Sequence, residues 1–169
     1  YDQIKKLDLE IQTEKEEVVN FIFSENGQIR GYETIDKLKF KNLQYLDISK
    51  NSIAELPDSI DKLINLQYFA CSKTGLQRLP KEIGRLTNLV YLNFNQNDLE
   101  LLPPQIGNLE KLEILDLWSN NFSEYPSTLG SLKALKVIDL RNILISDEVQ
   151  TSITNMLPNS KVYMSPSCK

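Results

Sequence analysis

Three tyrosines recur at a constant spacing in this 169-residue chain. Tyr45, Tyr68 and Tyr91 lie 23 residues apart, and each is third in an eleven-residue phrase: LQYLDISKNSI, LQYFACSKTGL and LVYLNFNQNDL. Tyrosine and tryptophan offer large contact areas at a low cost in conformational entropy, which suits them to binding a partner. On neighbouring strands the rings can equally stabilise the fold through cross-strand contacts, at about 0.2–1 kcal/mol each. The spacing supports both interpretations.

Two further copies of the phrase carry other residues suited to binding. Trp118 and Arg141 are seventh in these copies, and exposed side chains of these two types often dominate the energetics of protein interfaces. Ile114 and Val137 replace the tyrosine at the third position, while Asp and Asn are common at the fifth. The candidate partner-binding residues are Tyr45, Tyr68, Tyr91, Asn93, Asn95, Asp116, Trp118, Asp139 and Arg141.

The sequence offers little for catalysis or metal binding. It contains no histidine, which excludes Ser-His-Asp and Cys-His nucleophile systems and histidine metal sites within this chain. Asp47 and Asp116 lie three copies of the phrase apart, too far to share a proton or an ion, and the adjacent Asp116 and Asp139 can hold a cation only weakly. Asp139 can instead pair with Arg141 or Lys136. We therefore predict no catalytic residues, no metal and no cofactor.

The composition is that of a globular domain without a basic surface. Hydrophobic residues are 41%, charged residues are 25%, and the net charge of −4 argues against nucleic acid as a partner. No apolar run approaches the roughly 18 residues of a transmembrane helix. Cys71 and Cys168 are too few for a disulfide framework, so we expect free thiols, with Cys71 buried. The chain begins at Tyr1 rather than Met, and we expect a preceding segment, for which an export signal is one candidate.

The apolar residues of the same phrase predict the elements that position these side chains. Positions one, four, six and eleven are apolar in all five copies, which has a chance of about 10⁻⁸ at a 41% apolar background. Positions four and six share one face of a short strand, and a single copy cannot bury them alone. Stacked copies would form a continuous core, and their strands would lie about 4.8 Å apart in a parallel sheet.

The ninth position of the phrase is Asn51, Thr74, Asn97, Asn120 and Ile143, and LPDSIDKL, LPKEIGRL, LPPQIGNL or YPSTLGSL follows four of the copies. Over about residues 18–157 the chain therefore resembles leucine-rich repeat proteins, in particular those with 23-residue bacterial repeats of the form LxxLxLxxNxL. The resemblance implies an α/β fold, a right-handed solenoid with a parallel concave β-sheet, short convex helical turns and a cap at each end. Positions three, five and seven would point away from the core, onto what we call the concave face.

Two further positions of the repeat have clear physical roles. Asparagine at the ninth position lies where the chain leaves the strand, and its amide can bond backbone groups that would otherwise be buried without partners. Thr74 and Ile143 lack this amide, so we expect looser turns there. Proline starts each convex helical turn, because its fixed φ suits the beginning of a helix. These prolines are Pro57, Pro80, Pro103 and Pro126.

We predict a single domain over residues 1–169. It consists of an N-terminal cap at 1–17, repeats at 18–42, 43–65, 66–88, 89–111, 112–134 and 135–157, and a C-terminal cap at 158–169. In the first repeat Phe21 takes the fourth position, and the alternating stretch at 4–13 reads as a strand. Ser146 is a candidate N-cap for a helix that ends before Pro158, and the segment KVYMS then reads as an edge strand.

The resemblance implies a non-catalytic module for protein–protein recognition, in which a monomer binds a protein partner on the concave face. A glycan bound by the aromatic residues is one alternative, because sugar rings stack on aromatic side chains. The recognition part of a larger enzyme and a self-associating spacer are two others. Analogy with bacterial repeat proteins favours an exported, secreted or cell-surface location over a cytoplasmic one.

Overall fold

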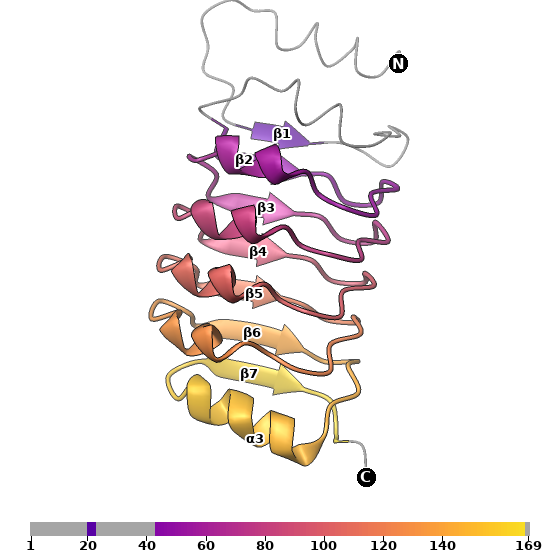
Figure 1. Ribbon diagram of the computed structural model, residues 1–169, viewed down its shortest axis with the longest axis vertical. Coiled ribbons are helices and arrows are strands. Elements are labelled where there is room, and N and C mark those ends of the chain that lie inside the picture. Colours follow the sequence, from indigo (N-terminus) through magenta and orange to yellow (C-terminus); the bar gives the residue numbers. More distant parts are fainter. Residues whose placement is uncertain (1–19, 23–42, 168–169) are drawn as a thin grey trace, which may run out of the picture.

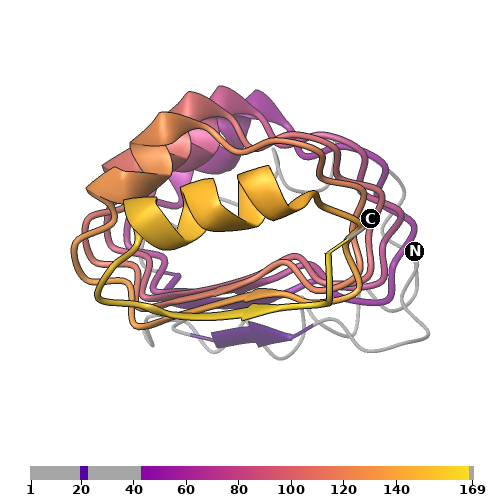
Figure 2. The same cartoon turned by 90° about the horizontal axis from the view of Figure 1, so that it is seen from below.

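The computed structural model describes residues 20–22 and 43–167, in which successive turns of a coil each place a strand on one side and a helical turn on the other (Figure 1, Figure 2). The strands form one parallel sheet in chain order, as predicted. They are β1 Asn20–Ile22, β2 Tyr45–Asp47, β3 Tyr68–Ala70, β4 Tyr91–Asn93, β5 Ile114–Asp116, β6 Val137–Leu140 and β7 Lys161–Met164. The predicted N-terminal cap and most of the first repeat lie outside the described residues.

Strands β2 to β6 pair at a constant offset of 23 residues. The row of direct neighbours across them is Tyr45, Tyr68, Tyr91, Ile114 and Val137. β1 pairs with β2 so that Phe21 lies beside Leu46, which confirms the predicted fourth position. β7 departs from the period, because Lys161 lies beside Val137 at an offset of 24 residues. A row across the sheet therefore corresponds to one position of the phrase from β2 to β6.

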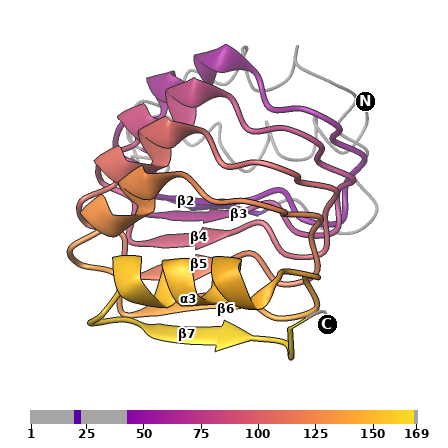
Figure 3. The same cartoon turned by 60° about the horizontal axis from the view of Figure 1, so that its bottom comes forward.

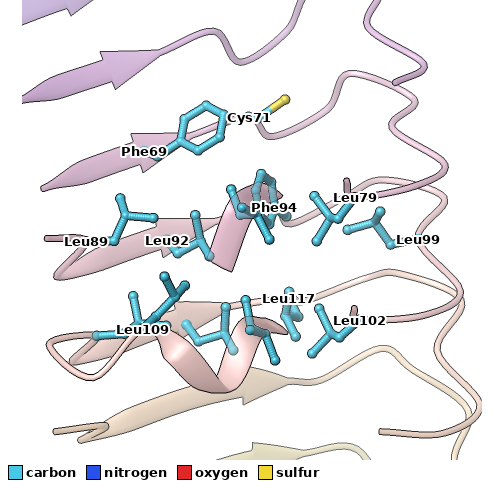
Figure 4. Packing of buried hydrophobic residues seen from close by; sticks show 14 of the residues in the cluster. Phe69, Cys71, Leu79, Leu89, Leu92, Phe94, Leu99, Leu102, Leu109 and Leu117 are labelled. Atoms are coloured by element: carbon cyan, nitrogen blue, oxygen red, sulfur yellow. The ribbon is translucent and has the colours of Figure 1, made fainter. Parts of the chain in front are cut away.

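The inward side chains form one core between the sheet and the helical turns. All twenty apolar residues at positions one, four, six and eleven are at most 5% exposed, which confirms the predicted pattern. Phe69 and Phe94 pack edge to face with ring centroids 5.4 Å apart, and the leucines of the next turn continue the stack (Figure 4). Cys71 is fully buried, as predicted, and loss of hydration raises the pKa of its thiol to about 12. Cys168 lies outside the described residues.

The convex turns are short 3₁₀-helices that begin directly after a proline, as predicted. They are η1 Asp58–Lys62, η2 Lys81–Arg85, η3 Pro104–Asn108 and η4 Ser127–Ser131, and the preceding prolines have φ between −65° and −72°. Gly84 and Gly107 allow neighbouring helical turns to approach closely. A Cβ atom at these positions would lie 2.3 and 2.5 Å from the carbonyl oxygens of Gln105 and Thr128.

The side chain of Asn97 connects two successive turns of the coil, as predicted for the ninth position. Its amide nitrogen donates to the carbonyl oxygen of Phe94 in its own turn (2.9 Å) and of Cys71 in the preceding turn (2.7 Å). Its Oδ1 accepts hydrogen bonds from the N–H groups of Thr74 and Leu76 at 2.9 and 3.1 Å. Asn97 is buried, so these bonds satisfy backbone groups that water does not reach.

Asn120 makes the equivalent bonds one turn later. Thr74 replaces asparagine, yet its turn stays hydrogen-bonded, because its hydroxyl donates to Asn97 Oδ1 at 2.9 Å and lies 3.5 Å from Cys71 Sγ. Ile143 is 1% exposed and joins the hydrophobic core. The residues just before the ninth position have left-handed backbone, with φ of 53–60°, and turn the chain off the strand: Lys50, Lys73, Gln96, Ser119 and Asn142.

The C-terminal end of the core is covered by α3, Asp147–Met156 (Figure 2, Figure 3). Ser146 caps this helix by accepting a hydrogen bond from the Val149 N–H at 3.4 Å, and Ile153 and Leu157 are buried in the core. The predicted N-cap, helix and following strand are all confirmed. The helix shields the leucines of the last turn, which have no further repeat to cover them.

Replacing Asn97 with alanine should lower the free energy of unfolding by about 2–4 kcal/mol, because several buried backbone groups would lose their partner. The exposed neighbour provides a matched control, and Asp98→Ala should change the stability by less than about 0.5 kcal/mol. Urea denaturation of both variants measures the difference. Equal losses would contradict a role for Asn97 in joining the turns.

The buried Cys71 thiol should make stability fall in alkaline solution. Its folded pKa of about 12 exceeds the ordinary value of 9.0, so the unfolded chain loses this proton first as the pH rises. This contribution to stability is full below about pH 9 and is lost as the pH rises towards 12. In Cys71→Ala, stability should be lower throughout but decline less between roughly pH 8 and 10.5. Parallel urea-unfolding curves across that range would refute the assignment.

Candidate partner-binding surface

Strands β2 to β7 present their outward side chains on the concave face (Figure 3). The third-position row is Tyr45, Tyr68, Tyr91, Ile114, Val137 and Lys161, and the fifth-position row is Asp47, Ala70, Asn93, Asp116, Asp139 and Tyr163. The seventh-position row contains Ser49, Ser72, Asn95, Trp118 and Arg141. All nine residues predicted to bind a partner lie on this face. Their role in binding stays a prediction.

The tyrosine row is a stack of parallel rings. Tyr45 and Tyr68 have ring centroids 4.1 Å apart and planes at 7°, and Tyr68 and Tyr91 have centroids 4.3 Å apart and planes at 0°. Tyr68 is therefore covered by a ring on both faces, so the row offers mainly ring edges and hydroxyl groups to a partner. Burial, followed by the Tyr45 hydroxyl, raises the pKa of the Tyr68 phenol. Asn93 Nδ2 donates to the Tyr91 hydroxyl at 3.3 Å.

Side chains at the fifth position fix the backbone of the seventh. The fifth-position oxygen accepts the seventh-position N–H at 2.9–3.1 Å in Asp47 with Ser49, Asn93 with Asn95, Asp116 with Trp118, and Asp139 with Arg141. In β3 the fifth position is Ala70, and Ser49 Oγ from the preceding turn accepts the Ser72 N–H instead, at 3.0 Å. The sequence analysis missed this role. Its signal is an Asp or Asn two residues before the chain turns off a strand.

The ion pairs on this face distinguish the two partners considered for Asp139. Its carboxylate pairs with Arg141, whose Nε lies 3.0 and 3.1 Å from the two oxygens and whose Nη2 lies 2.5 Å from Oδ2. This contact raises the pKa of the Arg141 guanidinium. Lys136 pairs with Glu113 instead, at 2.6 Å. Within residues 20–22 and 43–167, no group of three or more His, Cys, Asp or Glu side chains is placed to hold a metal ion.

Trp118 is the half-buried aromatic residue of the seventh-position row. It follows β5 and lies between Asn95 of the preceding turn and Arg141 of the following one. Its N–H donates to Asp116, and its carbonyl oxygen accepts a hydrogen bond from the Gln96 N–H at 2.7 Å. The backbone of Trp118 is thus fixed on both sides, while part of its side chain stays accessible to a partner.

Two residues of β7 also lie on the concave face, and the sequence analysis did not place them there. The ring of Tyr163 lies 5.3 Å from the guanidinium carbon of Arg141 and 4.7 Å from Lys161 Nζ, and both distances are in the range of cation–π contacts. β7 is missed because it departs from the 23-residue period and lacks the leucines of the phrase. The alternation of the segment KVYMS was the available signal.

Comparison with known protein families follows from this arrangement. A family model described as a leucine-rich repeat region matches residues 24–164. This chain belongs to the leucine-rich repeat family. A comparison with curated proteins gives no match for this leucine-rich repeat protein. In the part of the chain that the structure describes, none of its helices is long and apolar enough to cross a bilayer.

Solved structures of other leucine-rich repeat proteins share this fold. One from Leptospira interrogans is 31% identical with a TM-score of 0.80, and the match covers 85% of this chain and 36% of that chain. The ectodomain of the Arabidopsis thaliana receptor kinase GASSHO1/SCHENGEN3, in complex with CASPARIAN STRIP INTEGRITY FACTOR 2, is 32% identical with a TM-score of 0.64, covering 75% of this chain and 16% of that chain. Internalin C2 of Listeria monocytogenes is 26% identical with a TM-score of 0.62, covering 75% and 53%. The chain thus spans well under two thirds of each.

A double-mutant cycle should show that the tyrosine rings stabilise one another. Combining Tyr45→Ala with Tyr68→Ala should reveal a coupling of roughly 0.5–1.5 kcal/mol in the free energy of unfolding, as expected for contacting aromatic rings. The pair Tyr45 and Ile114 occupies the same row without contact, so its cycle should give a coupling near zero. Equal couplings in the two cycles would contradict a structural role for the stack.

Proposed function

We propose that this leucine-rich repeat protein is a non-catalytic recognition module that binds a protein partner on its concave face. The observation that carries the proposal is the cluster of Trp118, Arg141 and Tyr163 on neighbouring strands of this face. Tryptophan, tyrosine and arginine are the residue types that supply most of the binding energy in protein interfaces. We call these three residues the β5–β7 cluster.

The rigidity of the supporting sheet favours this function. The N–H groups of Trp118 and Arg141 are held by Asp116 and Asp139, and the Arg141 side chain is held by the same Asp139 carboxylate. A side chain that is already held loses less conformational entropy when a partner binds. The cluster therefore offers large contact surfaces at a low ordering cost.

The geometry of the tyrosine row favours a polypeptide over a glycan. Sugar rings stack on the open faces of aromatic side chains, whereas both faces of Tyr68 are covered by Tyr45 and Tyr91. Ring edges and hydroxyl groups suit contacts with the side chains and backbone of a protein. Glycan binding is left with the outer parts of the row and with the β5–β7 cluster.

The relatives agree with this proposal at the level of the fold. Leucine-rich repeats form extended recognition surfaces, and the similar plant receptor ectodomain is in complex with another factor. This chain spans only part of each relative, so a larger protein in which it recognises targets for a catalytic domain is consistent with the same surface. An exported or surface location, and a monomeric state, stay predictions.

Trp118→Ala should weaken binding to the partner at least tenfold, because the largest side chain of the β5–β7 cluster would be lost. Its melting temperature should stay close to that of the parent protein, since Trp118 lies outside the core. Partner affinity is measured by isothermal titration calorimetry once the partner has been isolated, and stability is measured by thermal unfolding.

Leu144→Ala provides the control for this substitution. Leu144 is a large hydrophobic residue that is 81% exposed and lies outside the three outward rows of the concave face, so its replacement should leave affinity unchanged. A large loss of stability in Trp118→Ala with intact binding would overturn the assignment of Trp118 to the interface.

A further inference from the structure

The third-position row is an apolar strip that ends in a positive charge. Across β2 to β6 the row consists of three tyrosines followed by Ile114 and Val137, and Ile114 is 37% exposed. On β7 the next residue of the row is Lys161. Six strands at about 4.8 Å spacing give a length near 24 Å, which is the reach of roughly seven extended residues.

Lys161 differs from the other cations beside it on the concave face. Arg141 is paired with Asp139, and Lys136 is paired with Glu113. The Lys161 side chain is exposed and lies 4.7 Å from the ring centroid of Tyr163, and among the described residues no carboxylate lies within ion-pair distance of it. The strip therefore ends in a charge that is not balanced by a neighbouring side chain.

Tyr163 brings a second cation towards the same place. Its ring contacts Lys161 and also lies 5.3 Å from the guanidinium carbon of Arg141. Asp139 engages the Nε and Nη2 atoms of Arg141, which leaves further N–H donors of the guanidinium for another acceptor. An anion at this end of the strip would meet an ammonium group and a guanidinium group on either side of one aromatic ring.

We infer that the concave face binds an extended segment of an acidic partner polypeptide. Apolar side chains of the segment lie on the third-position row, and a carboxylate at its end lies against Lys161 and Arg141. Charge complementarity selects this occupant, because a carboxylate balances the free ammonium group and can accept hydrogen bonds from the guanidinium. This inference rests on the proposed function, since it specifies the partner of the same face.

A random twelve-residue peptide library displayed on phage tests the inference with the described protein as bait. Selected peptides should combine apolar residues with Asp or Glu, and their synthetic versions should bind at least tenfold more weakly to Lys161→Gln. Lys161→Arg should retain most of the affinity, because the charge is kept. Lys133→Gln removes an exposed lysine that bonds the Gly130 carbonyl oxygen away from this face, and it should have no effect. Binding should also weaken as salt rises.

The outcomes separate this inference from the proposed function. Selected peptides that lack acidic residues, that lose affinity in Trp118→Ala and that are unaffected by Lys161→Gln would overturn the inference and support recognition by the concave face. Peptides unaffected by either substitution would contradict both. A library that yields no binder to the parent protein would overturn an extended linear segment as the ligand.

Discussion

The structure depends on parallel strand pairing at a constant offset of 23 residues. Because neighbouring strands are about 4.8 Å apart, residues at one position of the phrase become direct neighbours along the sheet. Inward positions become a continuous stack of leucines and phenylalanines, and outward positions become rows on the concave face. The aromatic stack of Tyr45, Tyr68 and Tyr91 is thus a consequence of the same offset that builds the core.

The concave face can serve recognition because the turns satisfy their own polar groups. Asn97 and Asn120 bond the backbone of two successive turns, and the carboxylate of Asp116 bonds the N–H that follows β5. Where Thr74 interrupts the series of asparagines, Asn97 of the next turn accepts its hydroxyl. The hydrogen bonds of the coil are therefore made largely within and between its turns, and the outward side chains are left to contact other molecules.

Most of the fold could be predicted from the sequence, because it depends on side-chain types at fixed spacings. The twenty inward residues, the prolines before the helical turns and the Ser146 cap all follow from local patterns. Features that depend on contacts between turns could not be predicted in this way. The spacing of the tyrosines placed their rings side by side but could not show that they stack face to face. Lys161 and Tyr163 escaped because the last strand shifts the period by one residue, which moves every side chain out of the column of its predecessors.

The two halves of the concave face differ in what they can offer a partner. The half around Tyr68 is uniform, with stacked rings that stiffen one another and show similar edges from strand to strand. The half from β5 to β7 is varied, and its Trp118, Arg141 and Tyr163 differ in shape and charge, so it has more capacity to discriminate between partners. A segment lying along one strand would meet only the three outward side chains of that strand. Engaging both halves requires a partner that crosses the strands, and the rows across the sheet, rather than any single repeat, are therefore the unit of recognition.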